Sequence, residues 1–408
     1  MTLSATAPIN EALASRLAAI VGERRVLFRP SELLTYASDG LPSYLKQPGV
    51  AVFPGTREQL IDVVRELAQL RISFVPRGAG TGLSGGALAD GVVLIGLNRL
   101  NRILSIDAEN GLAVVEPGVV NVALSRAVAA HGFHYAPDPS SQTACTIGGN
   151  VAENAGGPHC LKYGVTTNHV VALTVLLSSG DVVVLGTANG EHEGYDLVGT
   201  FVGSEGCFGI ALDITVRLSR NPEAVRTLLA DFMSMDSAAR AVSEIVATGI
   251  IPAALEMIDQ PTIRAVESSI YAAGYPIDAA AALLIELDGA TVGLERDVAT
   301  VEALCITNGA RTVRVARDDA ERARLWQGRK RLSAQWAVCR PTWSCKTPWF
   351  RGQNFPIYSR RFMTSANATA YKFAMCFTPV TETCTQTFRT TRPIPTRRRA
   401  FTRPCARS

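Results

Sequence analysis

Short apolar runs and amphipathic segments alternate along most of the chain. Apolar side chains recur at helical spacing over residues 9–21, and brief strand-like runs alternate with helix-like segments from Val50 onward. Thr56, with Gln59 three residues later, is a helix-start signal. The pattern predicts strands at residues 50–54, 72–76, 92–97 and 112–115, helices at 56–70 and 122–131, and a hairpin that joins 171–177 to 182–185.

A second unit is expected after a boundary near Arg220-Asn-Pro-Glu. Its pattern predicts strand, helix, strand, strand, helix and strand at residues 226–232, 235–249, 254–258, 281–287, 292–308 and 311–316. This order is typical of a βαββαβ sandwich, and a helix at residues 318–331 follows it. Because the elements do not alternate as regular βαβ repeats, the expected fold class is α+β.

The densest glycine segment is Pro76-Arg-Gly-Ala-Gly-Thr-Gly-Leu-Ser-Gly-Gly86, which contains a G-x-G-x-x-G. A Rossmann interpretation needs the last glycine to open a helix, but residues 86–91 lead directly into the next strand, so we reject it. Main-chain N–H groups can converge on an anion here because no Cβ blocks its approach, and Thr81 and Ser84 add hydroxyls. The alternative is a flexible surface loop. The position between two apolar strands favours an anion site, with a diphosphate as its natural ligand.

Two further runs are rich in small residues. In Ile147–Gly157, the main chain could lie flat against a planar ligand while Asn150 and Asn154 reach the polar edge of that ligand. The segment Gly199–Ile210 has the same character. Any one run could serve tight packing, but three of them within residues 76–210 predict one elongated ligand with phosphates and a ring system.

These segments resemble those of the vanillyl-alcohol oxidase, or PCMH-type, flavoprotein family, and within it the D-lactate dehydrogenase and glycolate oxidase FAD-subunit branch. The resemblance rests on the first glycine loop, Pro137-Asp-Pro-Ser-Ser, Thr146-Ile-Gly-Gly-Asn-Val-Ala-Glu-Asn-Ala-Gly-Gly-Pro and Gly203-Ser-Glu-Gly, and it covers residues 10–330. It implies a PCMH-type FAD-binding domain of two α+β subdomains, followed by a ferredoxin-like cap domain. The expected divisions are an N-terminal helical segment (1–45), the FAD-binding domain (46–221), a C-terminally incomplete cap (222–330) and an aberrant basic tail (331–408).

The resemblance also implies how the segments would hold FAD. The first loop, from Arg77 to Gly85, would hold the diphosphate. Pro137, Asp138 and residues 140–149 would line the flavin and its phosphates, with Asn154 and Gly156 near the isoalloxazine. Residues 205–210 would lie near ribose and adenine. The implied cofactor-binding residues are Pro76, Arg77, Gly78, Ala79, Gly80, Thr81, Gly82, Leu83, Ser84, Gly85, Pro137, Asp138, Ser140, Ser141, Thr146, Ile147, Gly148, Gly149, Asn150, Asn154, Gly156, Gly157, Glu205, Gly206, Gly209 and Ile210. Some relatives attach flavin through a histidine in the first loop; Gly80-Thr81 stands there, so non-covalent FAD is implied, and no metal ligands are assigned.

Candidate catalytic residues are harder to assign. Oxidising a 2-hydroxy acid moves a hydride from the α-carbon to flavin N5 while the hydroxyl loses a proton, and the carboxylate needs a cation. The resemblance places these duties in V-V-P-R-T-K and H-A-G-D-G-N-L-H-P segments after residue 340, and neither segment is present. The catalytic residues therefore stay unassigned. His159 is the histidine closest to the expected flavin, either as a site residue or as a polar loop residue.

The net charge of +4 conceals an uneven distribution. Residues 331–408 hold 14 Lys and Arg but one acidic residue, whereas residues 1–330 hold 26 bases and 35 acids. One hypothesis is that the tail is translated out of frame and disordered. Codons shifted by one base permit V-F-H-A-G-D-G-N-L-H-P from residues 376–386 and Q-D-A-V-V-P-R-T-K-L-P from residues 346–356. The alternative is a genuine basic extension that binds nucleic acid or lipid.

The sequence thus predicts an FAD-dependent oxidoreductase of the 2-hydroxy-acid class, acting on glycolate or D-lactate and impaired by its tail. A MurB-like flavin reductase and a non-enzymatic nucleic-acid binder are the alternatives. Companion electron-transfer subunits are expected partners, and nucleic acid is not. The absence of a long apolar run or signal-like start favours a cytoplasmic protein, with a peripheral position at the inner face of the membrane as the alternative.

Overall fold

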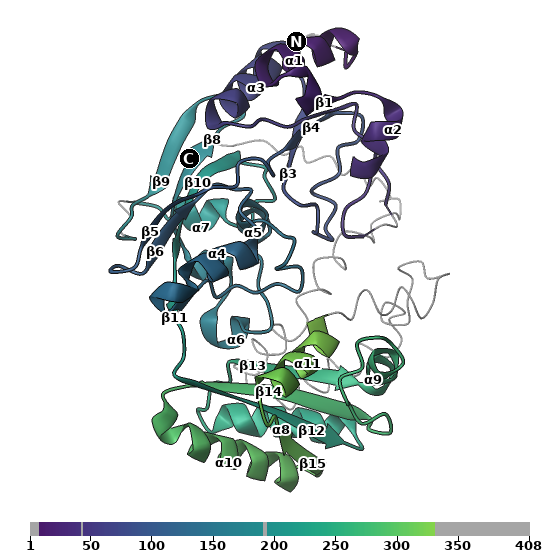
Figure 1. Cartoon of the computed structure of the whole chain (residues 1–408), viewed down its shortest axis with the longest axis vertical. Helices are drawn as coiled ribbons and strands as arrows, with labels where there is room; N and C mark the ends of the chain where they lie inside the picture. The colour runs from purple at the N-terminus through teal and green to yellow at the C-terminus, as the bar shows by residue number, and fades with distance from the viewer. Residues whose placement is uncertain (1–7, 42–43, 191–193, 331–408) are drawn as a thin grey trace, which may run out of the picture.

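The computed structural model describes residues 8–41, 44–190 and 194–330, which form a first domain with two main sheets and a second domain with one sheet, called the cap below (Figure 1). The expectations for the basic tail and for the start of the chain, residues 1–7, lie outside these ranges. Within them, no helix is long and apolar enough to cross a membrane.

The first subdomain is a four-stranded sheet of order β1-β2-β4-β3 with helices α1 and α3 packed on it. Strand β4 pairs in parallel with β2 and β3, and β1 pairs antiparallel with β2. The α3 helix begins as expected, since the Thr56 hydroxyl accepts a hydrogen bond from the Gln59 N–H at 3.3 Å. The elements are α1 (Glu11–Val21), η1 (Glu23–Arg25), β1 (Val26–Leu27), α2 (Pro30–Leu33), η2 (Leu34–Tyr36), β2 (Val50–Val52), α3 (Arg57–Leu70), β3 (Phe74–Arg77) and β4 (Val93–Gly96).

The second subdomain is a five-stranded antiparallel sheet of order β5-β6-β10-β8-β9. The predicted hairpin of β8 and β9 is confirmed. Strand β5 was not predicted, because three of its five residues are exposed and its apolar pattern is weak. The elements are β5 (Ile103–Asp107), β6 (Leu112–Val115), α4 (Asn121–Val128), η3 (Ala129–His131), β7 (Phe133–His134), α5 (Ile147–Glu153), α6 (Cys160–Tyr163), η4 (Thr166–Asn168), β8 (Val170–Leu176), β9 (Val182–Gly186), α7 (Leu197–Phe201), β10 (Ile210–Arg217) and β11 (Ser219–Arg220).

The cap is an antiparallel sheet of order β13-β14-β12-β15, the strand order of a ferredoxin-like βαββαβ unit. Alternate residues of the central strands face opposite sides. Leu283 and Ile285 pack with helices α8 and α10, whereas Ala282 and Leu284 pack with α9 and α11. The elements are β12 (Ala224–Phe232), α8 (Met235–Ala247), β13 (Ala254–Asp259), α9 (Gln260–Glu267), β14 (Ala281–Gly289), α10 (Thr291–Thr307), β15 (Ala310–Val315) and α11 (Asp319–Lys330).

Two features that bear on the site differ from the sequence-based prediction. The first is helix α9, for which no helix was predicted. The expectation that the run from Ile147 lies flat was wrong for its first part, which forms helix α5. Thr146 caps that helix by accepting a hydrogen bond from the Gly149 N–H at 3.3 Å. The N-cap Thr146 followed by small residues therefore forms a helix here rather than an extended, irregular segment.

Candidate functional site

The first glycine loop begins where strand β3 ends, and Arg77 anchors its base. The Arg77 side chain is buried and donates hydrogen bonds to three carbonyls, those of Ser38 (2.8 Å), Ala87 (3.2 Å) and Tyr36 (3.4 Å). Its guanidinium therefore holds the two ends of the loop against the preceding segment. The cationic side chain of Arg77 is committed to this structural role.

The middle of the loop leaves main-chain donors available. Within the described residues, the N–H groups from Ala79 to Ser84 donate no hydrogen bond. Gly80 and Gly85 have φ values of 67° and 86°, in the region that favours glycine. An added Cβ at Gly82 would meet nothing closer than a Glu153 oxygen at 3.6 Å. The loop is thus an open array of main-chain donors, as an anion site requires.

The fold brings the three small-residue runs together. An added Cβ on Gly78 would collide with the Thr146 hydroxyl, and one on Gly206 would lie 3.2 Å from Pro76. The third run is joined to helix α5 by the Glu205 N–H, which donates to the Ala152 carbonyl at 2.8 Å. The expected cofactor residues of these runs are therefore neighbours in space.

The turn in the third run is conformationally strained. Glu205 has a φ of 53° and stands between Gly203 and Gly206, whose φ values are 84° and 78°. A left-handed backbone at a non-glycine residue is uncommon and gathers at ligand sites. The strain is consistent with a turn shaped to approach a ligand.

Carboxylates surround the first loop. Asp39 accepts a hydrogen bond from the Gly85 N–H at 3.1 Å, and Glu153 accepts one from the Ser84 hydroxyl at 3.2 Å. Partial burial, together with the nearby charge of Glu205, raises the pKa of Glu153. These acids fix the shape of the loop, and sequence reasoning did not single out Asp39 or Glu153.

The Pro137–Ser141 segment is held at both ends. The Pro137 carbonyl accepts a hydrogen bond from the buried Asn121 side chain at 2.8 Å. Asp138 is buried, and its carboxylate contacts His159 and Lys330. A Cβ on Gly157 would collide with Asp138, so glycine is required here for the close approach of the main chain at Gly157 to the Pro137–Ser141 segment.

Two buried polar groups close to these runs lack partners. Within the described residues, Asn150 Nδ2 and Ser204 Oγ have no hydrogen-bond partner. An unsatisfied buried donor is costly and usually marks a ligand or water position. Together with the open N–H array, these groups fit a dinucleotide that spans the three runs.

The cap contributes a charged junction that the sequence did not reveal. Glu286 on β14 accepts hydrogen bonds from His159, Thr227, Arg322 and Trp326. Beside it, His159 and helix α11 line a pocket of about 210 Å³. The order of the residues could not place Glu286 near His159, since 127 positions separate them.

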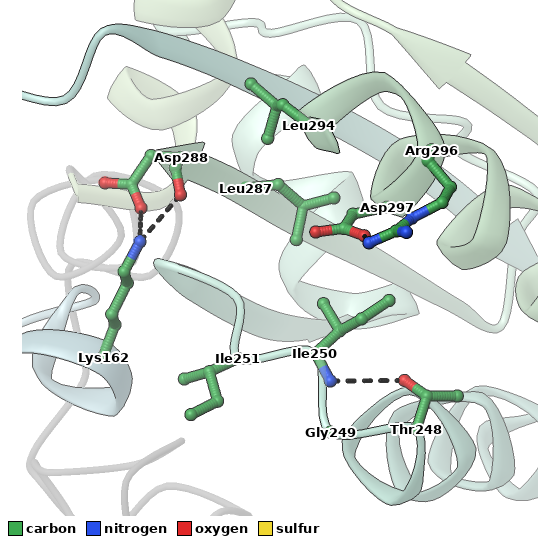
Figure 2. A pocket seen from close by; sticks show the side chains of 10 residues that line it. All are labelled: Lys162, Thr248, Gly249, Ile250, Ile251, Leu287, Asp288, Leu294, Arg296 and Asp297. Carbon is green, nitrogen blue, oxygen red and sulfur yellow. Dashed lines mark hydrogen bonds and ion pairs between the residues drawn. The ribbon is translucent and has the colours of Figure 1, made fainter. Parts of the chain in front are cut away.

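A second junction lies at helix α6. Lys162 donates hydrogen bonds to the Asp288 carbonyl at 2.7 Å and to its carboxylate, and Figure 2 shows this side chain crossing from α6 to the cap. Tyr163 also donates to Asp288. A pocket of about 450 Å³ opens beside the pair, lined by Ile250 and Ile251 and by charged residues at the start of α10.

The expected cofactor residues divide by position. Those in or beside the three converging runs are Pro76, Gly78, Ala79, Gly80, Thr81, Gly82, Leu83, Ser84, Gly85, Thr146, Ile147, Gly148, Gly149, Asn150, Asn154, Glu205, Gly206, Gly209 and Ile210. Those at the junction with the cap, or leading to it, are Pro137, Asp138, Ser140, Ser141, Gly156 and Gly157. Arg77 lies beneath the first loop. No cluster of three or more His, Cys, Asp or Glu in residues 8–41, 44–190 and 194–330 could hold a metal ion.

Comparison with known proteins gives two family matches. A model described as an FAD binding domain matches residues 48–186, and one described as the C-terminal domain of FAD linked oxidases matches residues 221–347. The second match ends inside the basic tail, 17 residues beyond the described part of the cap.

Relatives agree with these matches. The glycolate oxidase subunit GlcD of Escherichia coli K12 is 47% identical over 307 residues, which are 75% of this chain and 61% of that protein. A D-lactate dehydrogenase of Anaerostipes hadrus is 32% identical over 76% of this chain and 67% of its own length. The chain thus spans about three-fifths of the length of the GlcD subunit.

A solved structure confirms the predicted fold. p-Cresol methylhydroxylase with bound substrate superposes with a TM-score of 0.66 at 17% identity, over 78% of this chain and 70% of that one. The PCMH-type α+β fold, FAD as cofactor and the resemblance to the glycolate oxidase and D-lactate dehydrogenase branch are confirmed. The chain belongs to the family of FAD-linked oxidoreductases that join an FAD-binding domain to the C-terminal domain of FAD-linked oxidases.

Proposed function

We propose that this protein is an FAD-dependent oxidoreductase of the 2-hydroxy-acid class, with glycolate or D-lactate as the candidate substrates. The observation that carries the proposal is the convergence of three small-residue runs around an open array of main-chain donors. The names of the relatives supply the substrate class. They favour this branch over a MurB-like reductase or a nucleic-acid binder.

The cofactor would be held mainly by main chain. The N–H groups from Ala79 to Ser84 would bind the diphosphate, and Asn150 and Ser204 would provide side-chain donors. When bound, FAD supplies a hydride acceptor. The first loop carries Gly80-Thr81 and no histidine, which supports non-covalent binding.

The chain lacks the residues expected to bind and deprotonate the substrate. A 2-hydroxy acid needs a cation for its carboxylate and an acceptor for its hydroxyl proton. The V-V-P-R-T-K and H-A-G-D-G-N-L-H-P segments expected for these tasks are absent from the chain. We therefore propose that the chain binds FAD but turns over glycolate and D-lactate slowly or not at all.

GlcD is named as a subunit of glycolate oxidase, and this supports our proposal that companion electron-transfer subunits also exist for this chain. Coexpression with candidate companions from the same genome, followed by affinity capture of the tagged chain, tests this. A chain that is stable, yellow and captured alone in every such pairing would contradict the partner proposal.

A visible spectrum of the purified full-length chain tests the cofactor proposal. Bound oxidised flavin should absorb near 450 nm, about the wavelength of the free cofactor, and acid precipitation should release it to the supernatant. A folded but colourless protein that stays colourless with excess FAD would refute the proposal. Flavin that stays with the precipitate would refute non-covalent binding.

Two further measurements test the impaired site and its cause. Anaerobic addition of D-lactate or glycolate should leave the bound flavin oxidised, and rapid bleaching at ordinary enzymatic rates would overturn the predicted impairment. For the out-of-frame tail, the gene is sequenced in independent isolates. A shifted reading that encodes the two missing segments is expected, and a clean frame without it would end the hypothesis.

A further inference from the structure

His159 lies between two carboxylates that belong to different domains. Its Nδ1 is 2.8 Å from the Asp138 carboxylate, and its Nε2 is 3.0 Å from the Glu286 carboxylate. The His159 main-chain N–H also donates to Asp138 at 3.3 Å. Asp138 belongs to the segment expected to line the flavin, whereas Glu286 is in the central strand of the cap.

The charges require a cation at this position. A neutral imidazole has one N–H, so one of the two carboxylates would face a nitrogen lone pair; only the imidazolium can donate to both. The imidazole is largely buried, with 19% of the side chain exposed. Burial opposes protonation, but Asp138 and Glu286 outweigh it and raise the pKa of His159 to about 9.

Each carboxylate is also held by its own domain or by helix α11. Lys330 donates to Asp138 at 2.9 Å, and Arg322 donates twice to Glu286, at 2.8 and 2.9 Å. Trp326 donates to Glu286 at 2.6 Å, and its ring lies 5.5 Å from that of His159. The two carboxylates are therefore fixed, and the imidazole is the direct side-chain bridge between them.

Other charged groups near the bridge already have partners or lie at its margin. Glu256 is paired with Arg329 at 2.9 Å, and Asp288 with Lys162. His134 is hydrogen-bonded to Asn221 at 3.0 Å. Burial is the main cause that lowers the pKa of His134, and the positive charge of His159 lowers it further. Asp319 stands at the rim of the pocket. None of these groups replaces the double contact of His159.

We propose that His159 is a positioning residue, a doubly hydrogen-bonded cation that fixes the Pro137–Ser141 segment against the cap. Both ring nitrogens are engaged as donors, so His159 does not accept the proton of a substrate hydroxyl. Fixing this segment matters for catalysis only if it lines FAD, and in that respect the inference rests on the proposed function. The bridge itself is a property of the two domains and is testable without turnover.

The first test reads the protonation state of the wild-type full-length chain. Nitrogen-15 NMR of labelled histidine rings should show one ring with both nitrogens protonated at pH 7.5 that loses a proton only near pH 9. The signal is assigned by its loss in His159→Gln. A ring that titrates near the ordinary histidine pKa of about 6.5, or that is singly protonated at pH 7.5, would overturn the inference even if the protein is yellow.

The second test asks whether the bridge holds the segment. His159→Gln keeps one donor and loses the charge, His159→Lys restores the charge, and His131→Gln replaces an exposed histidine of the same domain as the matched control. In His159→Gln, hydrogen exchange should quicken by at least about tenfold, the scale of one lost charge-assisted hydrogen bond, in β14 and at Gln142 and Ala144, whose N–H groups donate to the Pro139 and Ser141 carbonyls of the segment. FAD should also dissociate faster, with partial recovery in His159→Lys and no change in His131→Gln.

Equal exchange in His159→Gln and wild type would overturn the proposal. If His159→Gln does not fold, the wild-type chain decides the matter on its own. Exchange at Gln142 and Ala144, whose N–H groups donate to the segment, should then rise between pH 7.5 and pH 10 beyond the intrinsic base-catalysed increase measured in loop residues far from the bridge. An increase no larger than that reference would reject the bridge.

Discussion

Replacing Gly82 by alanine separates cofactor binding from folding. The φ of Gly82 lies outside the left-handed region, and an added Cβ would have only Glu153 atoms nearby, at 3.6 and 3.9 Å. These are ordinary contact distances, so Gly82→Ala should change the free energy of unfolding by less than about 0.5 kcal/mol. If the loop holds the diphosphate as proposed, the same Cβ should crowd the phosphate beside the main-chain donors.

The expected loss is the interaction of those donors with a phosphate. A hydrogen bond to a charged group contributes about 1.5–3 kcal/mol, which corresponds to a rise in the Kd for FAD of roughly ten- to hundred-fold. Titration of the apoprotein with FAD, followed by quenching of flavin fluorescence, measures the Kd, and thermal unfolding of the apoprotein measures stability.

Gly249→Ala is the matched control. Gly249 has a φ of 84° and open space around it, in the cap and away from the glycine loops. Alanine there should lower stability by about 1 kcal/mol through backbone strain and leave the Kd for FAD unchanged. A Gly82→Ala protein that binds FAD as tightly as wild type would show that the first loop does not hold the diphosphate.

Three further changes test the supports of the site. Arg77→Gln should destabilise the apoprotein by about 2–4 kcal/mol, since the buried guanidinium donates to three carbonyls; an unchanged melting temperature would contradict the anchoring role. Trp326→Phe should cost about 1.5–3 kcal/mol by removing the 2.6 Å hydrogen bond to the charged Glu286. Trp343→Phe, which makes the same change outside the described residues, is the control substitution. Despite burial, hydrogen bonds from His159 and Arg322 hold the pKa of Glu286 well below its usual range. The contribution of the Glu286 carboxylate to stability is therefore complete above pH 4.5 and is lost as the pH falls. Denaturant unfolding of wild type and Glu286→Gln should show that their difference in free energy of unfolding is smaller at pH 4 than at pH 7. A difference that is constant between the two pH values would refute this assignment.

Local patterns in the sequence determined many of the elements and predicted an elongated ligand with phosphates and a ring system, while the family resemblance identified that ligand as FAD. Helix α3, the β8–β9 hairpin and the strands of the cap follow from apolar periodicity, a Thr56 cap and a short turn, all of which act over a few neighbouring residues. The glycines of the first loop mark where the main chain turns and leaves its N–H groups open to a ligand. Elements with weak local signals, such as β5, were missed because their strand conformation depends on pairing with a neighbour.

Only the tertiary structure decided how side chains from distant segments share their charges. His159, Glu286 and Lys330 belong to three segments, and the docking of the cap on the FAD-binding domain makes them neighbours. That docking decides the protonation of His159, since the pKa of a buried group depends on the charges around it and not on its place in the chain. The tertiary structure also decided what the Arg77 guanidinium holds, because the acceptors that the fold brings to it are the main-chain carbonyls of three residues distant in sequence or across the loop.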